Sequence, residues 1–148
     1  MSHKLFYLLH TAHHKLFSQA DKICLDQLGV TSVQLSALFF LSKHDGCQAK
    51  ELGKGLSLNN SAITGLLNRL NNLGLIKKTT SSADARATQI FLTEKALIII
   101  PQGLTLVKHL NQALAQSFSE AELDTVARFL STLTKLEGET LLPVKNQK

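Results

Sequence analysis

The sequence predicts a mainly α-helical chain with a small β-wing, an α+β fold in which a winged helix-turn-helix lobe carries extra helices at both ends. Three observations predict it. A helix with one apolar face begins near Asn59 and ends at Gly74. Two short strands separated by a polar turn follow that helix, and long amphipathic segments flank the whole stretch. We expect residues 1–148 to form a single domain, with residues 31–93 as the winged lobe.

Residues 5–28 are expected to form a long first helix, because apolar residues recur along one stripe at spacings of three to five. A helix of this length spans roughly 35 Å, too long for a small domain to cover by itself. The surplus of apolar surface therefore suggests a partner chain. Gly29 is expected to end the helix.

The next two helices lead up to the central one. Thr31 and Gln34 have the spacing of a capping box, which predicts a helix over residues 32–43. His44-Asp45-Gly46 is a turn signal. Residues 48–55 are expected to form a short third helix, and residues 55–58 the turn that follows it.

The central helix has two contrasting faces. At about 100° per residue, one side is apolar and is expected to be buried; its members are Ile63, Leu66, Leu67, Leu70 and Leu73. The opposite side carries Asn, Ser, Thr and Gly, where a solvated face would be rich in Glu and Lys. Asn can pair bidentately with adenine, Ser and Thr can bond to a base or a phosphate, and Gly65 permits close approach of the backbone. A polar surface that merely lacks charge is the alternative.

Two strands are expected after this helix, over residues 75–78 and 89–92, with a polar turn over residues 81–87 between them. A helix-turn-helix followed by such a ribbon places one helix in a DNA major groove and a loop beside it.

The carboxyl-terminal part is expected to form two helices. Thr93 is a plausible N-cap for a helix with Glu94 in its first turn and an apolar run over residues 96–118, in which Pro101 should cause a kink. Ser119 and Glu122 suggest a second capping box, for a helix from residue 120 to about residue 141 that Pro143 ends. We expect residues 1–28 and 94–143 to form a helical dimerisation layer.

Charge is distributed unevenly along the chain, whose formal net charge is +5. Residues 47–95 carry seven basic and three acidic side chains, whereas residues 119–140 carry two basic and five acidic ones. Positive potential on the proposed reading lobe is what phosphate contacts require. Because no signal-peptide layout and no membrane-length apolar run is present, we expect a cytoplasmic protein without membrane contact.

Several segments resemble one family of regulators. They are Glu51-Leu52-Gly53-Lys54, the run from Leu70 to Lys78, Asp84-Ala85-Arg86-Ala87 and the run from Ile90 to Ala96. With them, the chain resembles the MarR/SlyA family of winged-helix transcription regulators over essentially its whole length. The resemblance implies a homodimer that binds a pseudo-palindromic operator in double-stranded DNA. It also implies a repressor that a small-molecule effector or an oxidant releases.

The resemblance also implies roles for the wing. Arg86 would enter the minor groove and Asp84 would hold the wing tip, whereas a surface ion pair is the alternative. Lys78 stands where the family usually has Arg, so it supplies charge without a bidentate fork. The full set of expected DNA-binding residues is Asn59, Asn60, Ser61, Thr64, Asn68, Arg69, Lys78, Asp84 and Arg86.

The means of sensing is left open by the sequence. Cys24 could be a redox sensor if Lys15 and Lys22 lower its thiol pKa, or an inert buried cysteine. Cys47, expected in a loop near His44, could also be reactive.

The histidines and phenylalanines suggest two further kinds of ligand site, one for a metal and one for an effector. His10, His13 and His14 could suggest a metal, but no further ligand has suitable spacing, so solvated or interface histidines are favoured. Phe17, Phe39 and Phe40 could line an effector crevice, which the resemblance alone implies, or pack in the core.

Two other classes of protein were weighed. An enzyme is not expected, because the chain shows no catalytic triad order, no phosphate-cradling glycine loop and no paired carboxylates. We therefore expect no catalytic residue, no cofactor and no bound metal. A winged-helix protein-interaction module without DNA binding is the remaining alternative, which the basic wing opposes.

Overall fold

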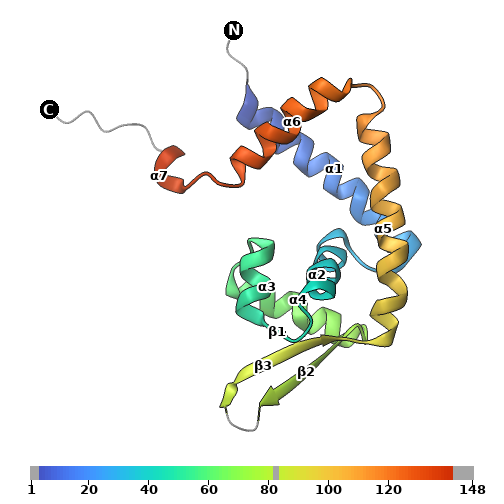
Figure 1. Ribbon diagram of the computed structural model, residues 1–148, viewed down its shortest axis with the longest axis vertical. Coiled ribbons are helices and arrows are strands. Elements are labelled where there is room, and N and C mark those ends of the chain that lie inside the picture. The colour runs from blue at the N-terminus through green and yellow to red at the C-terminus, as the bar shows by residue number, and fades with distance from the viewer. Residues whose placement is uncertain (1–3, 82–83, 142–148) are drawn as a thin grey trace, which may run out of the picture. The chain divides into compact units, whose positions relative to one another are not determined.

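The computed structural model describes residues 4–81 and 84–141, with the backbone alone at residues 81 and 84–87. Its elements are α1 (Leu5–Leu28), α2 (Ser32–Lys43), β1 (Cys47–Gln48), α3 (Ala49–Leu56), α4 (Asn60–Asn72), β2 (Ile76–Ser81), β3 (Asp84–Leu92), α5 (Glu94–Ala115), α6 (Glu120–Leu133) and α7 (Gly138–Leu141) (Figure 1). The chain forms two compact units, Met1–Leu106 and Val107–Lys148. The predicted fold class, mainly α with a small β-wing, is confirmed.

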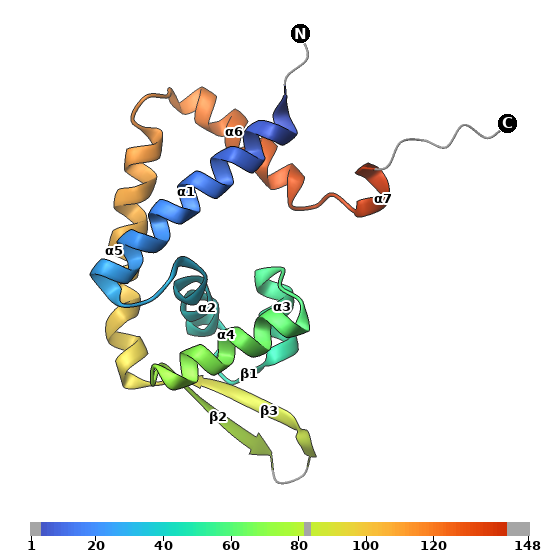
Figure 2. The ribbon, with the colours of Figure 1, turned by 180° about the vertical axis from the view of Figure 1, so that it is seen from behind.

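The core of the first unit lies between α2, α3, α4 and the sheet. All three helices lie on one side of the β2–β3 hairpin (Figures 1 and 2). The largest fully buried side chains come from these elements and from the turns beside them: Val30, Leu38, Leu41, Leu52, Leu66, Leu70, Leu75 and Ile90. Burial of a Leu or Ile side chain contributes roughly 1.5–3 kcal/mol, so these residues hold the lobe together.

Helix α3 fits against α2 through a glycine. A Cβ atom built on Gly55 would overlap Cε2 of Phe40, so only a residue without a side chain leaves room for that ring. The ring of Phe40 also stacks on His44, with 4.3 Å between ring centroids and 17° between planes. The α2–α3 contact is therefore specified in shape as well as in hydrophobicity.

The sheet has three antiparallel strands in the order β1-β3-β2. Ile76 pairs with Leu92 and Lys78 with Ile90, while Cys47 of β1 pairs with Ile90 from the other side. Strand β1 was not predicted. The predicted turn over residues 81–87 is wrong, because Ser81 ends β2 and residues 84–87 belong to β3. Thr80 pairs with Thr88 and Ser81 with Asp84, with an irregularity in the register between these two pairs, so the ribbon extends further into the polar segment than its apolar residues indicate.

The junction between α1 and α2 matches the prediction. Gly29 ends α1 in a left-handed conformation, with φ of 71°. The capping box of α2 is present: Thr31 N donates to Gln34 Oε1 at 2.9 Å, and Gln34 N to Thr31 Oγ1 at 3.3 Å. Asp21 of α1 adds a tie, because its Oδ1 accepts hydrogen bonds from Ser32 N at 2.8 Å and Ser32 Oγ at 2.5 Å.

Helix α5 runs through Pro101 from Glu94 to Ala115 as one element. A kink at Pro101 stays a prediction. Gly103, which the sequence marks only as a weak helix former, has a packing role. A Cβ atom at this position would lie 2.5 Å from Cδ1 of Leu35 and 3.2 Å from Cζ of Phe39. Gly103 therefore allows α5 to approach α2 closely.

The carboxyl-terminal helix is shorter than predicted. The capping box formed by Ser119 and Glu122 is present, but α6 ends at Leu133 rather than near residue 141. The hydroxyl of Thr134 donates to the carbonyl of Ser131 at 2.8 Å, a local bond that competes with helix continuation. Gly138 then begins the short α7. Pro143 lies outside the described residues.

Within residues 4–81 and 84–141, no single helix has the length and hydropathy to cross a membrane. Only α1 and α2 taken together, bent by 68°, reach that length and composition.

Candidate nucleic-acid interface

The buried side of α4 fixes the orientation of the whole helix. Ile63, Leu66, Leu67 and Leu70 are buried, as the apolar pattern predicts. Leu73 is the exception: it is the C-cap residue and is 36 % exposed. Its position at the helix end, beyond the last full turn against the core, explains the difference.

The opposite side of α4 is exposed and nearly uncharged. Asn60, Ser61, Thr64 and Asn68 are exposed along it, and Gly65 lies between them. The hydroxyl of Thr64 donates to the carbonyl of Asn60 at 2.9 Å, which leaves its oxygen free to accept. Along this surface, hydrogen-bonding groups point into solvent from a helix whose other side is anchored.

Asn59 has a structural role in addition to any contact with a partner. It is the N-cap of α4, and its Oδ1 accepts a hydrogen bond from Ala62 N at 2.8 Å. Removing such a cap costs about 1 kcal/mol of stability. Its amide NH₂ group and the second lone pair of Oδ1 are left to meet a ligand.

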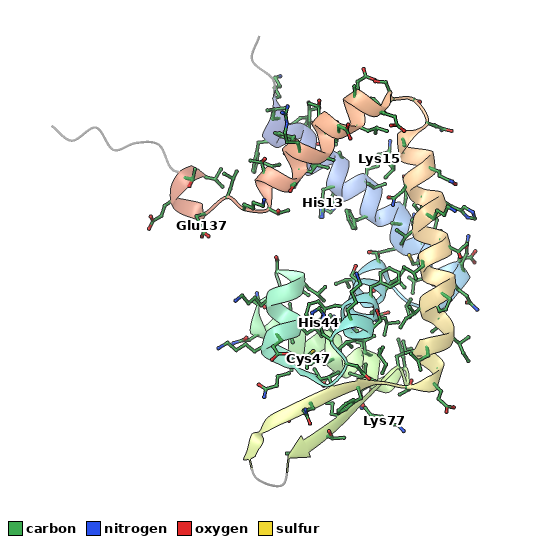
Figure 3. The ribbon with its side chains drawn as sticks, in the orientation of Figure 1. His13, Lys15, His44, Cys47, Lys77 and Glu137 are labelled. Atoms are coloured by element: carbon green, nitrogen blue, oxygen red, sulfur yellow. The ribbon has the colours of Figure 1, made fainter. Side chains whose placement is uncertain are left out.

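A side-chain hydrogen bond joins the wing to α4. Alternation along β2 puts Lys78 on the same face as the buried Ile76, the face that carries α4. Lys78 Nζ donates to Asn68 Oδ1 at 3.4 Å, a long and therefore weak hydrogen bond. It turns the amide NH₂ of Asn68 away from the lysine. The neighbouring Lys77 is exposed on the other face of the strand (Figure 3).

The carboxyl end of α4 is tied to the start of α5. Lys95 Nζ donates to the carbonyl of Leu73 at 2.7 Å, and the hydroxyl of Thr93 donates to the carbonyl of Gly74 at 2.7 Å. Thr93 N also donates to the carbonyl of Leu75 at 3.1 Å. Sequence reasoning identified Thr93 only as a cap for α5, and it missed Lys95. The available signal was a lysine three residues after the end of the second wing strand.

Comparison with known proteins decides the family. A family model described as MarR family matches residues 28–87. The organic hydroperoxide resistance transcriptional regulator of Bacillus subtilis is 31 % identical over 99 residues, which are 67 % of each chain. The chain belongs to the MarR family. A second relative, the HTH-type transcriptional regulator TtmR of Methylorubrum extorquens, is 28 % identical over 97 % of this chain and 74 % of its own.

Solved MarR-family structures share the fold. The S. aureus MepR–DNA complex matches 92 % of this chain and all of its own, with a TM-score of 0.81 and 24 % identity. A MarR variant from E. coli complexed with operator DNA matches 84 % of this chain and 92 % of its own, with a TM-score of 0.72 and 25 % identity. The resemblance to MarR/SlyA regulators is confirmed, and the chain is a winged-helix transcription regulator.

The expected MarR wing contacts fall partly outside the description. Asp84 and Arg86 belong to β3, where Asp84 pairs with Ser81. Their side chains lie outside the described part of the chain, so their roles stay predictions.

Arg69 lies at the edge of the exposed side of α4. It lines a hollow of about 300 Å³ with Leu25, Thr31 and Gln34. Arg69 lies about 100° around the helix from Asn68, on the flank toward the α1–α2 turn.

Both cysteines of this MarR-family chain are buried. Cys24 is 2 % exposed and Cys47 is 7 % exposed. Burial raises the pKa of the Cys24 thiol, and Asp21 raises it further. Burial also raises the pKa of the Cys47 thiol, with Glu51 and Asp45 adding to the effect against its own backbone hydrogen bond. Lowering of the Cys24 pKa by lysines, one of the two alternatives for that residue, is wrong, and the other alternative, a buried cysteine, is confirmed. Cys47 is buried in β1 and does not lie in a loop.

The histidines of α1 are exposed side chains on one helix. His10 and His14 lie edge to face, with 5.6 Å between ring centroids, and His13 lies 4.7 Å from Phe17. No group of three or more His, Cys, Asp or Glu side chains suited to a metal ion occurs in the part of the chain that the structure describes.

The three phenylalanines do not line one site. Phe17 is exposed on α1, whereas Phe39 and Phe40 are partly buried against Gly103 and Gly55, respectively. Core packing accounts for the latter two.

Proposed function

We propose that this MarR-family chain binds duplex DNA as a two-fold homodimer and represses transcription from a pseudo-palindromic operator. Helix α4 would lie in the major groove and the β2–β3 wing beside it. A small effector would release the repressor. Under this proposal, residues 31–93 bind DNA, residues 1–28 and 94–143 form the dimerisation layer, and the protein acts in the cytoplasm without catalysing a reaction.

The observation that carries the proposal is the exposed side of α4. Amide and hydroxyl groups project from it, while four buried side chains hold the helix in place. Direct readout requires such groups, since base edges in the major groove present donor and acceptor patterns. We assign base contacts to Ser61, Thr64 and Asn68.

Under this proposal, the remaining expected residues contact the DNA backbone or the minor groove. The amide groups of Asn59 and Asn60 at the amino end of α4 suit a phosphate, because the positive end of the helix dipole lies there. Lys78 and Arg69 supply charge on opposite flanks of the helix. Arg86 would enter the minor groove, with Asp84 supporting the wing tip.

Exposed apolar side chains support a partner chain. On α1, Phe6 is 87 % exposed, and Tyr7 and Leu8 are more than half exposed. On α6, which buries none of its residues, Val126 and Leu130 are nearly half exposed. Apolar surface of this extent is typical of an interface. A second copy is the natural partner, because homodimers with two-fold symmetry are the commonest oligomers.

A small molecule is a better effector than an oxidant for this chain. The name of the B. subtilis relative refers to organic hydroperoxide resistance. Here, however, both thiols are buried and have raised pKa values, which opposes formation of the reactive thiolate.

The test is recovery of genomic fragments that the purified protein retains, followed by a salt titration on the preferred fragment. We expect a palindrome with half-sites roughly 10 bp apart and an affinity that falls steeply with salt concentration. A protein that ignores duplex DNA at low salt would instead be an interaction module, and the proposal would be abandoned.

A further inference from the structure

The carboxyl end of the reading helix is held by side chains that the proposed DNA contacts do not use. Lys95 Nζ and Thr93 Oγ1 each lie 2.7 Å from a carbonyl oxygen, those of Leu73 and Gly74. Leu73 is the C-cap of α4, and Gly74 starts the turn into β2, with φ of 71°. Both donors come from the first residues of α5 or immediately before it.

The chemistry of the Lys95 bond is unusual for an exposed lysine. The last carbonyls of a helix have no partner within the helix and usually bond to water. Here the carbonyl of Leu73 accepts from an ammonium group, and a hydrogen bond with a charged donor is about twice as strong as a neutral one. Because both groups are near solvent, water can replace the lysine at little cost in folding. The hydrogen bond from Lys95 therefore orients the end of α4 more than it stabilises the folded protein.

The direction of the chain at the carboxyl end of α4 matters for base recognition. Asn68 lies little more than one helical turn before Leu73, and β2 starts three residues after Leu73. The bond joins α5 to the segment that connects the reading surface to the wing. A recognition group must be held within about 0.5 Å of its productive position, which a helix end free to pivot does not ensure.

We propose that Lys95 is a positioning residue, which sets the angle of α4 relative to the wing and so determines base preference without touching DNA. Thr93 supports it through Gly74, but its hydroxyl also lies 3.4 Å from Ala96 N at the start of α5. Lys95 is therefore the cleaner residue to change. The inference rests on the proposed function, since it concerns how well α4 reads DNA.

The experiment compares Lys95→Met, Lys95→Arg and wild type, all as the full chain. Methionine keeps much of the aliphatic stem but loses the donor, whereas arginine keeps a charged donor that can reach the carbonyl. We expect Lys95→Met to lower the affinity ratio between the preferred operator and a scrambled duplex by about tenfold. The ratio should be restored in Lys95→Arg. Urea unfolding should change little in either variant.

Lys77→Met is the matched control, because Lys77 is an exposed lysine on the wing. A lysine that neutralises a phosphate raises affinity for every sequence, so its loss lowers that affinity and reduces the salt slope by about 1. We expect that signature for Lys77→Met, with the affinity ratio unchanged. For Lys95→Met, we expect the wild-type salt slope.

Three results would overturn the inference: an unchanged affinity ratio in Lys95→Met, a salt slope reduced as in Lys77→Met, or no recovery with arginine. The second would make Lys95 a phosphate contact. Failure of the proposed function gives a different result, since wild type would then show no preference for any operator. Preference in wild type that survives in Lys95→Met refutes the positioning role alone.

Discussion

Replacing Gly65 with alanine tests whether the exposed side of α4 contacts DNA or only solvent. Gly65 lies in the interior of α4, near the middle of its polar side. A Cβ atom there would lie 3.6 Å from Nη2 of Arg69, an ordinary van der Waals contact, so the substitution causes no clash within the protein. Alanine is favoured over glycine in a helix interior by about 0.8–1 kcal/mol. We therefore expect Gly65→Ala to raise the free energy of unfolding by roughly 0.5–1 kcal/mol.

The same methyl group should weaken DNA binding. If the backbone at Gly65 approaches the bases, a methyl group in that space displaces the helix or removes close contacts. We expect a loss of about tenfold in affinity for the preferred operator, equivalent to about 1.4 kcal/mol. Stability and DNA affinity would then change in opposite directions.

The assay measures both quantities on the same preparations. The chain has no tryptophan, so urea unfolding is followed by far-ultraviolet circular dichroism, at one fixed protein concentration because a dimer's stability depends on it. DNA affinity is measured by fluorescence anisotropy of a labelled operator. Gly138→Ala is the control, since a Cβ atom at Gly138 has nothing within 4 Å and the residue lies outside the lobe. A Gly65→Ala protein that is more stable and binds DNA as tightly as wild type would refute the reading role of this surface.

Four further outcomes are expected. Arg86→Ala should weaken operator binding by roughly 1–3 kcal/mol with the dimer intact, as checked by gel-shift titration and gel filtration; unchanged affinity would count against the wing assignment. Asn68→Ala should relax base preference more than non-specific affinity, and identical motifs from parallel site selections would contradict this. Because the thiol pKa values of Cys24 and Cys47 are raised on folding, their contribution to stability is complete below the unfolded value of about 8.5 and is lost as pH rises through the folded values. Urea midpoints should therefore fall more steeply above about pH 8.5 in wild type than in a variant with both cysteines replaced by valine, and parallel curves would contradict the pKa directions. Gly103→Ala should destabilise the chain by roughly 1–2 kcal/mol in thermal unfolding, since overpacking at 2.5 Å outweighs the gain in helix propensity, and a more stable variant would refute the packing role.

Local patterns in the sequence were sufficient to predict most helices of the lobe. The bounds of α1 and α2 were predicted to the residue, because Gly29 and the Thr31–Gln34 capping box act through neighbours a few positions away. The buried side of α4 followed from its period, except at Leu73. These features depend on short-range geometry, which the chain encodes directly.

What the sequence did not reveal depends on contacts between distant residues. Strand β1 has two residues, and it exists because Cys47 pairs with Ile90 across more than forty positions. The hollow that Arg69 lines beside the α1–α2 turn, and the bond from Lys95 to Leu73, likewise follow from how elements pack. No pattern along one helix contains that information.

The close packing of the Phe40 ring against Gly55 constrains the angle at which the chain leaves α3. Because the ring of Phe40 occupies the space that a Cβ atom at Gly55 would fill, α2 and α3 can pack in one register only. Sliding α3 by one residue would bring Lys54 or Leu56 against Phe40, where neither side chain fits in place of a hydrogen atom. The direction in which α4 starts is thus prescribed by a missing side chain on an element that carries none of the proposed base-reading groups.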